Sequence, residues 1–226
     1  MKSNYRYIVK AFMAMAVIAG TTSCDDFLDR EPMSSISPET YYSTAAQLEA
    51  NLNDEYPNVL PSFGQWTYGI FGEDKGTDNQ IEVNANDRYT QDRWKVPHSE
   101  SDNWKFERIY RINFFLSEAL PKFGEDMSGS QNTISGSVAT IKHYIGEMYF
   151  LRAYEYFKKL QLFGDFPIID QPLADEMEAL REASKRFPRN EVARFILKDL
   201  DEAVSRLKER GFQNNQRINK QAALVL

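Results

Sequence analysis

Residues 62–105 combine aromatic rings with polar side chains in a pattern that could bind a ligand. All three tryptophans of the chain fall in this stretch, and we expect Trp66 and Trp94 to be the main contacts. Flat rings stack on the C–H faces of sugars, and planar polar groups pair with sugar hydroxyls. The polar residues interleaved with the rings include Asp74, Asp78, Asn79 and Arg88, of which Arg88 is one that we expect to take part. The alternative is that the rings pin a long loop to the body of the protein.

Other chemistry finds little support in the residue pattern. The run EDKGTDNQ at 73–80 is rich in oxygen ligands, but it lacks the D-x-D-x-D-G spacing of a Ca²⁺ loop, so we expect no metal and no cofactor. Carboxylates are numerous, yet no pair stands out as a glycosidase site, and neither histidine has triad companions. We therefore expect no catalytic residues. Glu147, Arg152 and Glu155 have the spacing of a structural ion pair on one helix.

The start of the chain has the pattern of an export signal. Basic residues precede an apolar run from Ala11 to Gly20, which is too short for the roughly 20 residues that cross a bilayer. Small residues then lead to Cys24, an arrangement that resembles a bacterial lipoprotein processing site, although Thr21 stands where Leu is preferred. We expect a signal peptide at 1–23 and a lipidated acidic, Ser/Pro-rich tether at 24–37. The alternative is a secreted protein with a free thiol.

The charge of the chain argues against some partners. The formal net charge is −6, and it becomes more negative once the basic signal segment is set aside. No basic stripe is present. We therefore expect neither nucleic-acid binding nor electrostatic docking on anionic lipid, and we expect membrane attachment through the lipid alone.

Apolar spacing predicts a mainly α fold for the body at 38–226. We expect helices at 44–59 (ending near Pro57), 103–120 (ending at Pro121), 137–163 (ending at Gly164), 190–211 (capped by Asn190) and 219–226, with partial helix at 175–186. The helix at 137–163 carries apolar residues on several faces, so we expect it to be buried between neighbours. Antiparallel helix pairs of this kind suggest tetratricopeptide-like stacking with a long irregular loop region. Because the last helix turns apolar and then stops, we expect a domain cut off at its C-terminal end.

Five motifs in order resemble the SusD/RagB family of nutrient-binding lipoproteins. The most specific is EMYFLRAYEYFKKLQLFGDFPII at 147–169, in which Met148 replaces a commoner small residue. The others are CDDFLD at 24–29, Trp104 with IYRIN at 109–113, ILKDLDEAVSRL at 196–207, and RINKQAALVL at 217–226. They are spread in order from one end of the chain beyond the signal to the other, and five ordered matches make the resemblance specific.

The resemblance implies a fold, a location and partners. It implies tetratricopeptide-like helix pairs and a lipid anchor on the outer face of the cell outer membrane. It also implies capture of an oligosaccharide, or of another nutrient such as a peptide, and transfer to a TonB-dependent transporter of the SusC type. Asp74, Asp78 and Asn79 match an acidic loop of the family, so the resemblance implies that they contact the ligand. An enzyme acting on glycans is a further alternative, and a helical scaffold without a small ligand is another.

Overall fold

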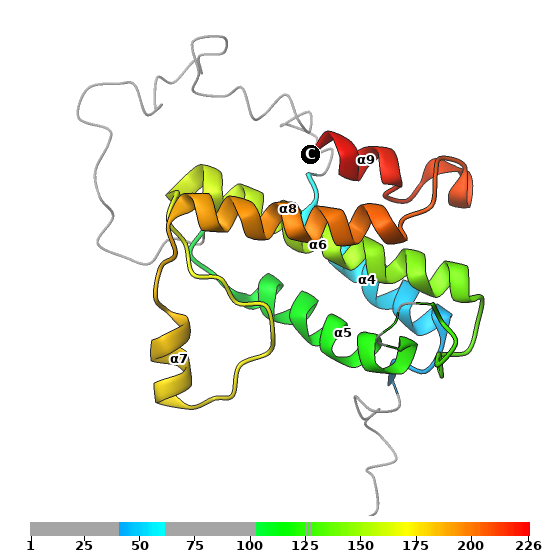
Figure 1. Cartoon of the computed structure of the whole chain (residues 1–226), viewed down its shortest axis with the longest axis horizontal. Coiled ribbons are helices and arrows are strands. Elements are labelled where there is room, and N and C mark those ends of the chain that lie inside the picture. The colour runs from blue at the N-terminus through cyan, green and yellow to red at the C-terminus, as the bar shows by residue number, and fades with distance from the viewer. Residues whose placement is uncertain (1–40, 62–102, 125, 127) are drawn as a thin grey trace, which may run out of the picture. The chain divides into compact units, whose positions relative to one another are not determined.

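The computed structural model describes residues 41–61, 103–124, 126 and 128–226, and the fold below concerns Tyr42–Leu226. Figure 1 shows these residues as a set of packed helices. The helices are α4 (Ala45–Val59), α5 (Glu107–Phe123), α6 (Val138–Phe163), α7 (Met177–Ala183), α8 (Arg189–Arg206) and α9 (Lys220–Val225), with a short 3-10 turn, η2 (Phe212–Asn215), before α9. The described residues contain no strands, only two isolated β-bridges. The predicted mainly α class is confirmed.

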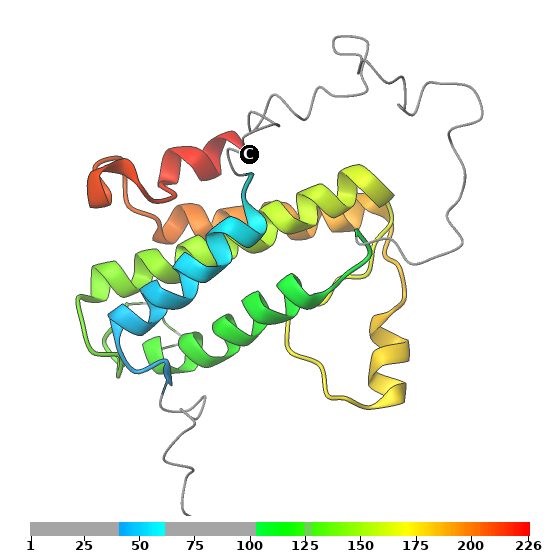
Figure 2. The same cartoon turned by 180° about the vertical axis from the view of Figure 1, so that it is seen from behind.

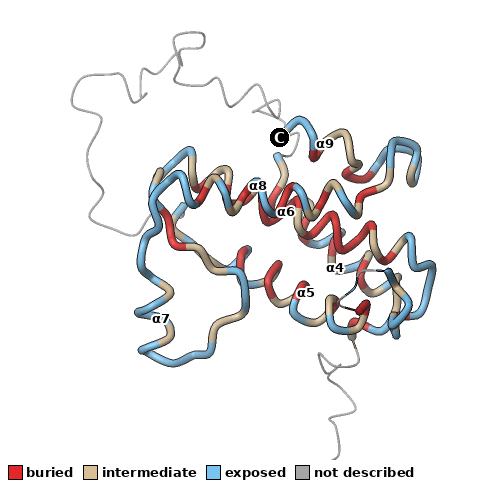
Figure 3. Tube along the Cα trace, viewed as in Figure 1, coloured by how far each residue is buried: buried red, intermediate tan, exposed pale blue. Residues whose placement is uncertain are grey.

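Helix α6 is the central element of this unit. It packs on α4, α5 and α8, and α8 in turn packs on α9. Figures 1 and 2, which view the molecule from opposite sides, show α6 lying between α4 and α8. Buried side chains therefore occur on every side of α6, as its apolar pattern predicts, and Figure 3 shows the buried residues concentrated along it. The hydrophobic core of the unit is built around this helix.

Gly146 allows α8 to approach α6 closely. A Cβ atom at this position would lie 2.9 Å from Cβ of Arg206 and 3.2 Å from the backbone nitrogen of Leu207. Glycine normally weakens a helix, because its backbone has more freedom to lose on folding. Its presence in the middle of the longest helix is therefore explained by packing against the end of α8.

Several helix boundaries follow the local signals. Thr44 and Gln47 form a capping box, in which the Thr44 Oγ1 accepts from the Gln47 N–H at 3.2 Å and the Gln47 Oε1 accepts from the Thr44 N–H at 3.0 Å. The Asn219 side chain accepts from the Ala222 N–H at 3.1 Å and so caps α9. Helix α6 ends at Gly164, whose φ is 69°, a conformation that suits glycine.

The two prolines expected to end helices lie inside the last turn instead. Helix α4 continues past Pro57 to Val59, and α5 continues past Pro121 to Phe123. Proline removes only its own N–H, so residues that follow it can still donate to helical carbonyls. Helical hydrogen bonds do form beyond each proline. In α4 the Leu60 N–H donates to the Tyr56 carbonyl at 2.9 Å, and in α5 the Gly124 N–H donates to the Leu120 carbonyl at 3.0 Å.

Three other expected boundaries were wrong. Helix α5 begins at Glu107 rather than near Asn103, because the residues before it are drawn into an aromatic cluster. Asn190 lies within the first turn of α8, and the Asp165 carboxylate accepts from the Arg189 N–H at 2.9 Å at this end. Helix α8 ends at Arg206, before Gly211, because the Lys208 N–H donates to His143 of α6 and does not continue the helix.

Candidate functional site

The residues predicted to bind a ligand lie outside the described part of the chain. This applies to Trp66, Asp74, Asp78, Asn79, Arg88 and Trp94, and also to Cys24 with the signal and tether segments. Those predictions stay predictions. The structure does place the two chain segments that border residues 62–102, namely the end of α4 and the start of α5.

An apolar pocket of about 360 Å³ opens beside the start of α5. We call it the α5–α7 pocket, because α5, α7 and the loop at 167–175 form its walls. Its apolar and aromatic walls include Trp104, Phe106, Ile109, Tyr110, Pro167, Ile169 and Leu180, and its polar groups include Gln171, Asp175 and Ser184. Concave apolar sites with a few polar groups are typical ligand pockets.

Trp104 forms a rigid wall of this pocket. Its ring meets Phe163 edge to face with centroids 4.7 Å apart, and it meets Phe166 at 4.8 Å. The guanidinium carbon of Arg186 lies 4.8 Å from the centroid of the Trp104 ring. Packing therefore explains the position of this tryptophan, as its place near a helix start suggests, while part of the ring still lines the pocket.

The other walls provide an aromatic ring and two polar groups. Tyr110 is 50% exposed, so its ring has a face available to a ligand. Gln171 and Asp175 offer planar amide and carboxylate groups that can pair with hydroxyls. Sequence analysis missed these three residues. The signal for Tyr110 was present, because it lies one residue off the buried face of α5 marked by Ile109 and Ile112.

A second pocket, of about 300 Å³, has a polar floor made by Arg152 and Asp199. Arg152 Nε and Nη2 each lie 2.7 Å from an Asp199 oxygen, and Nη1 donates to Oδ1 of Asn113 at 2.9 Å. Burial alone would lower the pKa of Arg152, but the hydrogen bonds and charge of Asp199 raise it. The guanidinium is thus a fixed charge that joins α6 to α8, which is a structural role.

The sequence predicted an ion pair of Arg152 with Glu147 or Glu155 within α6, and these partners were wrong. Arg152 pairs with Asp199 on α8, and Glu147 pairs with Arg217 in the segment before α9. Glu155 does pair on its own helix, but with Lys158 and Lys159 rather than with Arg152. Buried charges at the centre of a bundle need partners from whichever helix packs on them. The expected structural role is retained, with different partners.

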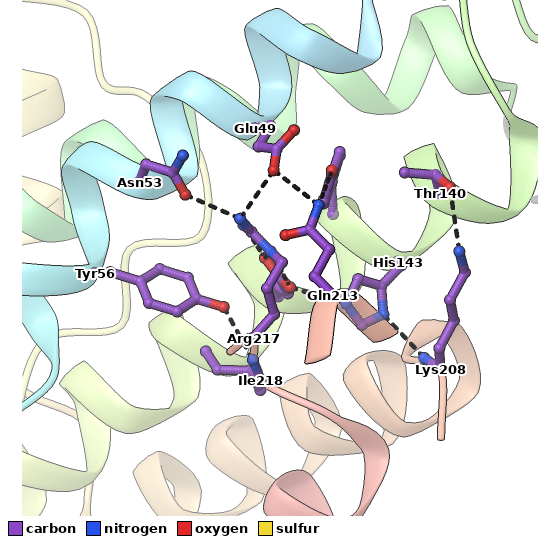
Figure 4. Close-up of polar contacts among 11 residues, drawn as sticks. Glu49, Asn53, Tyr56, Thr140, His143, Lys208, Gln213, Arg217 and Ile218 are labelled. Carbon is purple, nitrogen blue, oxygen red and sulfur yellow. Dashed lines mark hydrogen bonds and ion pairs between the residues drawn. The ribbon is translucent and has the colours of Figure 1, made fainter. Parts of the chain in front are cut away.

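Figure 4 shows the polar contacts that tie the η2–α9 segment to α4 and α6. Arg217 donates to Glu147 of α6 and, at 2.9 Å, to Oδ1 of Asn53 on α4. The Ile218 N–H donates to the Tyr56 hydroxyl at 3.0 Å. These groups saturate one another between packed helices, so we assign them to stability rather than to ligand binding.

His143 belongs to the same set of contacts. Its Nδ1 accepts from the Lys208 N–H at 2.9 Å, and its Nε2 lies 2.8 Å from Oε1 of Glu147. Because Nδ1 accepts a hydrogen bond, the proton of the neutral ring is on Nε2. The same Lys208 bond explains why α8 ends early. Within the described ranges, no cluster of His, Cys, Asp or Glu side chains has the arrangement of a metal site.

Comparison with known proteins decides the family. Residues 26–226 match the sequence model of a SusD-like family described as starch-binding and associating with the outer membrane. The chain belongs to this SusD-like family. The resemblance drawn from the five motifs is thus confirmed.

Curated relatives agree with this assignment. The SusD-like protein P2 of Formosa agariphila is 26% identical over 219 residues, which are 92% of this chain and 39% of that protein. The SusD-like protein P38 of the same organism is 25% identical over 208 residues, covering 90% of this chain and 38% of that one. The chain spans about two fifths of the length of these relatives.

Solved structures show the same fold. A SusD-like carbohydrate-binding protein from Bacteroides fragilis superimposes with a TM-score of 0.52 at 20% identity, covering 82% of this chain and 36% of that one. Another SusD-like protein from the same species gives a TM-score of 0.51 at 20% identity, over 86% and 36% of the two chains. The mainly α, tetratricopeptide-like fold of this SusD-like chain is thereby confirmed. None of its described helices is both long enough and apolar enough to cross a membrane.

Proposed function

We propose that this protein is a cell-surface lipoprotein that binds an oligosaccharide and passes it to a TonB-dependent transporter of the outer membrane. Membership of a family described as starch-binding and outer-membrane-associated supports glycan binding at that location. The export signal followed by Cys24 supports attachment through a lipid. Two independent features of the chain thus favour the same role.

The α5–α7 pocket is the observation that carries the proposal. It combines the aromatic faces of Trp104 and Tyr110 with the planar polar groups of Gln171 and Asp175. It also begins at Trp104, two residues after the 62–102 segment, which holds the aromatic and polar side chains predicted to bind glycan. We propose that this pocket is part of the glycan-binding surface of the chain.

Affinity electrophoresis of the full chain in gels containing soluble starch, laminarin, xylan or pectin tests glycan binding. We expect at least one polysaccharide to retard the wild-type protein. Tyr110→Ala and Asp175→Asn should each reduce the retardation, and Trp66→Ala with Trp94→Ala should reduce it further. Leu197→Ala is the control, because Leu197 is 60% exposed on α8 and lies outside the pocket.

The outcomes separate glycan binding from the alternatives. Retardation that survives all four substitutions would mean that neither these aromatic rings nor the Asp175 carboxylate belong to the binding surface. Binding of peptides with no binding of glycans would favour a different nutrient. Substantial release of reducing sugar by the purified protein would show an enzyme instead.

The proposed location and partner have their own tests. Metabolic labelling with a radioactive fatty acid should mark the wild-type protein and leave Cys24→Ala unlabelled. A tagged chain should also co-purify with an outer-membrane transporter from detergent extracts of the native host. Label on Cys24→Ala would show that the lipid is attached elsewhere.

A further inference from the structure

The second pocket lies directly beside the α5–α7 pocket. Gln171 lines both of them. The two residues before it divide between the pockets, because Ile169 lines the α5–α7 pocket and Asp170 lines the second one. Helix α5 is shared in the same way, with Ile109 in the α5–α7 pocket and Asn113, roughly 6 Å further along the helix, in the second pocket. The two pockets therefore meet along a strip made by α5 and this loop.

Buried side chains hold the loop part of this strip in place. The Asn113 side-chain amide donates to the Ile169 carbonyl at 2.8 Å, and the Tyr156 hydroxyl accepts from the Ile169 N–H at 2.8 Å. Nη1 of Arg152 donates to the Asp170 carbonyl at 3.1 Å. The residue that lines both pockets follows directly on these fixed backbone groups. A wall that is fixed before binding lowers the ordering cost when a ligand binds.

The second pocket offers the polar groups that the α5–α7 pocket has in small number. Its lining includes the hydroxyls of Ser117 and Tyr149, the ammonium of Lys198 and the carboxylate of Glu202. Ser117 and Lys198 are exposed, so both can reach a ligand from solvent. Hydroxyl and ammonium groups can each donate to the oxygens of a sugar. The ion-paired floor closes the pocket from below, and the groups around its rim are the ones that can bind.

The sizes of the two pockets suit a ligand that occupies both. The volumes are about 360 Å³ for the α5–α7 pocket and about 300 Å³ for the second pocket. Ligand pockets usually measure roughly 300–1,000 Å³, so each of these lies near the lower end of the range. One pocket by itself therefore suits a short ligand, whereas a chain of several sugars needs the two together.

We propose that the second pocket is a further sugar-binding subsite, so that one oligosaccharide passes Gln171 and places successive sugars in the α5–α7 pocket and in the second pocket. The inference rests on the proposed function, since it takes the α5–α7 pocket to bind glycan. Ser117 and Lys198 contact the sugar in the second pocket. Arg152 and Asp199 keep their structural role beneath it.

Isothermal titration calorimetry of the full chain with oligosaccharides of increasing length tests this proposal. The ligands are the disaccharide, the trisaccharide and the hexasaccharide cut from whichever of starch, laminarin, xylan and pectin retards the wild-type chain. Lys198→Met and Ser117→Ala each remove a donor from the second pocket. Tyr110→Ala removes a ring from the α5–α7 pocket and serves for comparison.

Each variant of the second pocket has a matched control on α8. Arg194→Met removes another exposed cation of the same helix, four residues before Lys198 and outside both pockets. Ser205→Ala removes a hydroxyl that donates to the carbonyl three residues earlier at 2.8 Å, as the Ser117 hydroxyl does at 2.9 Å. Ser205 also lies outside both pockets. The controls therefore repeat the chemical change without touching the proposed subsite.

We expect an effect that depends on the length of the ligand. The affinity of the wild-type chain should rise from the disaccharide to the hexasaccharide. Lys198→Met and Ser117→Ala should each lower the affinity for the hexasaccharide about five- to tenfold, the loss typical of one hydrogen bond, and leave the disaccharide affinity unchanged. Tyr110→Ala should weaken binding of both lengths. General damage to the fold would not produce a loss confined to long ligands.

Three results would overturn the inference while leaving glycan binding intact. The first is a wild-type affinity that does not increase with ligand length. The second is hexasaccharide binding by Lys198→Met and Ser117→Ala equal to that of wild type. The third is a loss that these variants share with Arg194→Met and Ser205→Ala, or that is the same for every length. If the wild-type chain binds none of the four polysaccharides, the proposed function itself fails, which is a different result.

Discussion

Arg217 and Glu147 form a fully hydrogen-bonded ion pair across the fold. The Arg217 Nε lies 2.8 Å from Oε1 of Glu147, and its Nη2 lies 2.6 Å from Oε2. The two side chains are 5% and 0% exposed. Because Glu147 is in the middle of α6 and Arg217 precedes α9, this one pair fastens the end of the described chain to the central helix.

Removing one partner of this pair should be costly. Arg217→Met leaves the Glu147 carboxylate buried without its cation, and we expect a loss of about 3–5 kcal/mol in the free energy of unfolding. The double variant, with both Arg217→Met and Glu147→Met, should lose less free energy of unfolding than the two single variants added together, because neither buried charge remains. Chemical denaturation at pH 7 measures the stability of the two single variants and the double variant.

Lys185→Met is the control. It breaks the ion pair between Lys185 and Glu182, whose side chains are 65% and 68% exposed, and it should change the free energy of unfolding by less than about 1 kcal/mol. Additive losses would contradict the pairing.

Tyr156→Phe should weaken the loop that forms part of the α5–α7 pocket. The Tyr156 hydroxyl accepts from the Ile169 N–H at 2.8 Å and donates to the Ile169 carbonyl at 3.1 Å. The carbonyl keeps a second donor, Asn113, but the N–H is left without a partner, which costs about 1–3 kcal/mol. Thermal and chemical denaturation would detect this loss. Tyr110→Phe is the control, because Tyr110 is half exposed. Equal stability of both variants would rule out the bond.

Gly146→Ala should destabilise the protein, although alanine favours helices. The propensity gain is about 0.5–1 kcal/mol. The added methyl group would lie 3.2 Å from the Leu207 nitrogen, a backbone atom with little room to move, and overpacking of this kind costs about 1–3 kcal/mol. We expect a net loss in the free energy of unfolding. A rise in melting temperature would show that α8 can move away from α6 without cost.

Glu155 and Glu55 should have opposite effects on the pH dependence of stability. Lysines hold the pKa of Glu155 below its unfolded value near 4.5, so its contribution is present above that pH and is lost as the pH falls. Burial raises the pKa of Glu55 despite Arg111, so its contribution is present at acid pH and is lost as the pH rises. Relative to wild type, Glu155→Gln should therefore lose more stability at pH 7 than at pH 3.

Glu55→Gln should show the reverse trend over the same range. Unfolding free energies from urea titrations between pH 3 and pH 7 would measure both differences. Glu182→Gln is the control, because this carboxylate is 68% exposed on α7. Parallel pH curves for Glu55→Gln and Glu155→Gln would contradict the opposite signs.

The sequence alone determined the helices and the family. Apolar residues three and four apart must share a helix face, so the spacing in α4, α5, α6 and α8 predicts a buried stripe wherever these helices pack. The helix caps formed by Thr44 with Gln47 and by Asn219 act within one helical turn. Local signals of this kind can be recognised from the sequence before the fold is known. The ordered motifs are likewise a property of the chain itself, and the match over residues 26–226 agrees with them.

Only the tertiary structure decided which distant groups meet. Glu147, Arg152 and Glu155 lie on one helix, so their spacing suggests ion pairs within that helix. The packing of α6 instead brings Asp199 to Arg152 and Arg217 to Glu147. The α5–α7 pocket arises in the same way, because Tyr110 and Asp175 are far apart in sequence and come together only when α5 and the 167–175 loop pack. Contacts between distant segments depend on the path of the whole backbone, which no local spacing encodes.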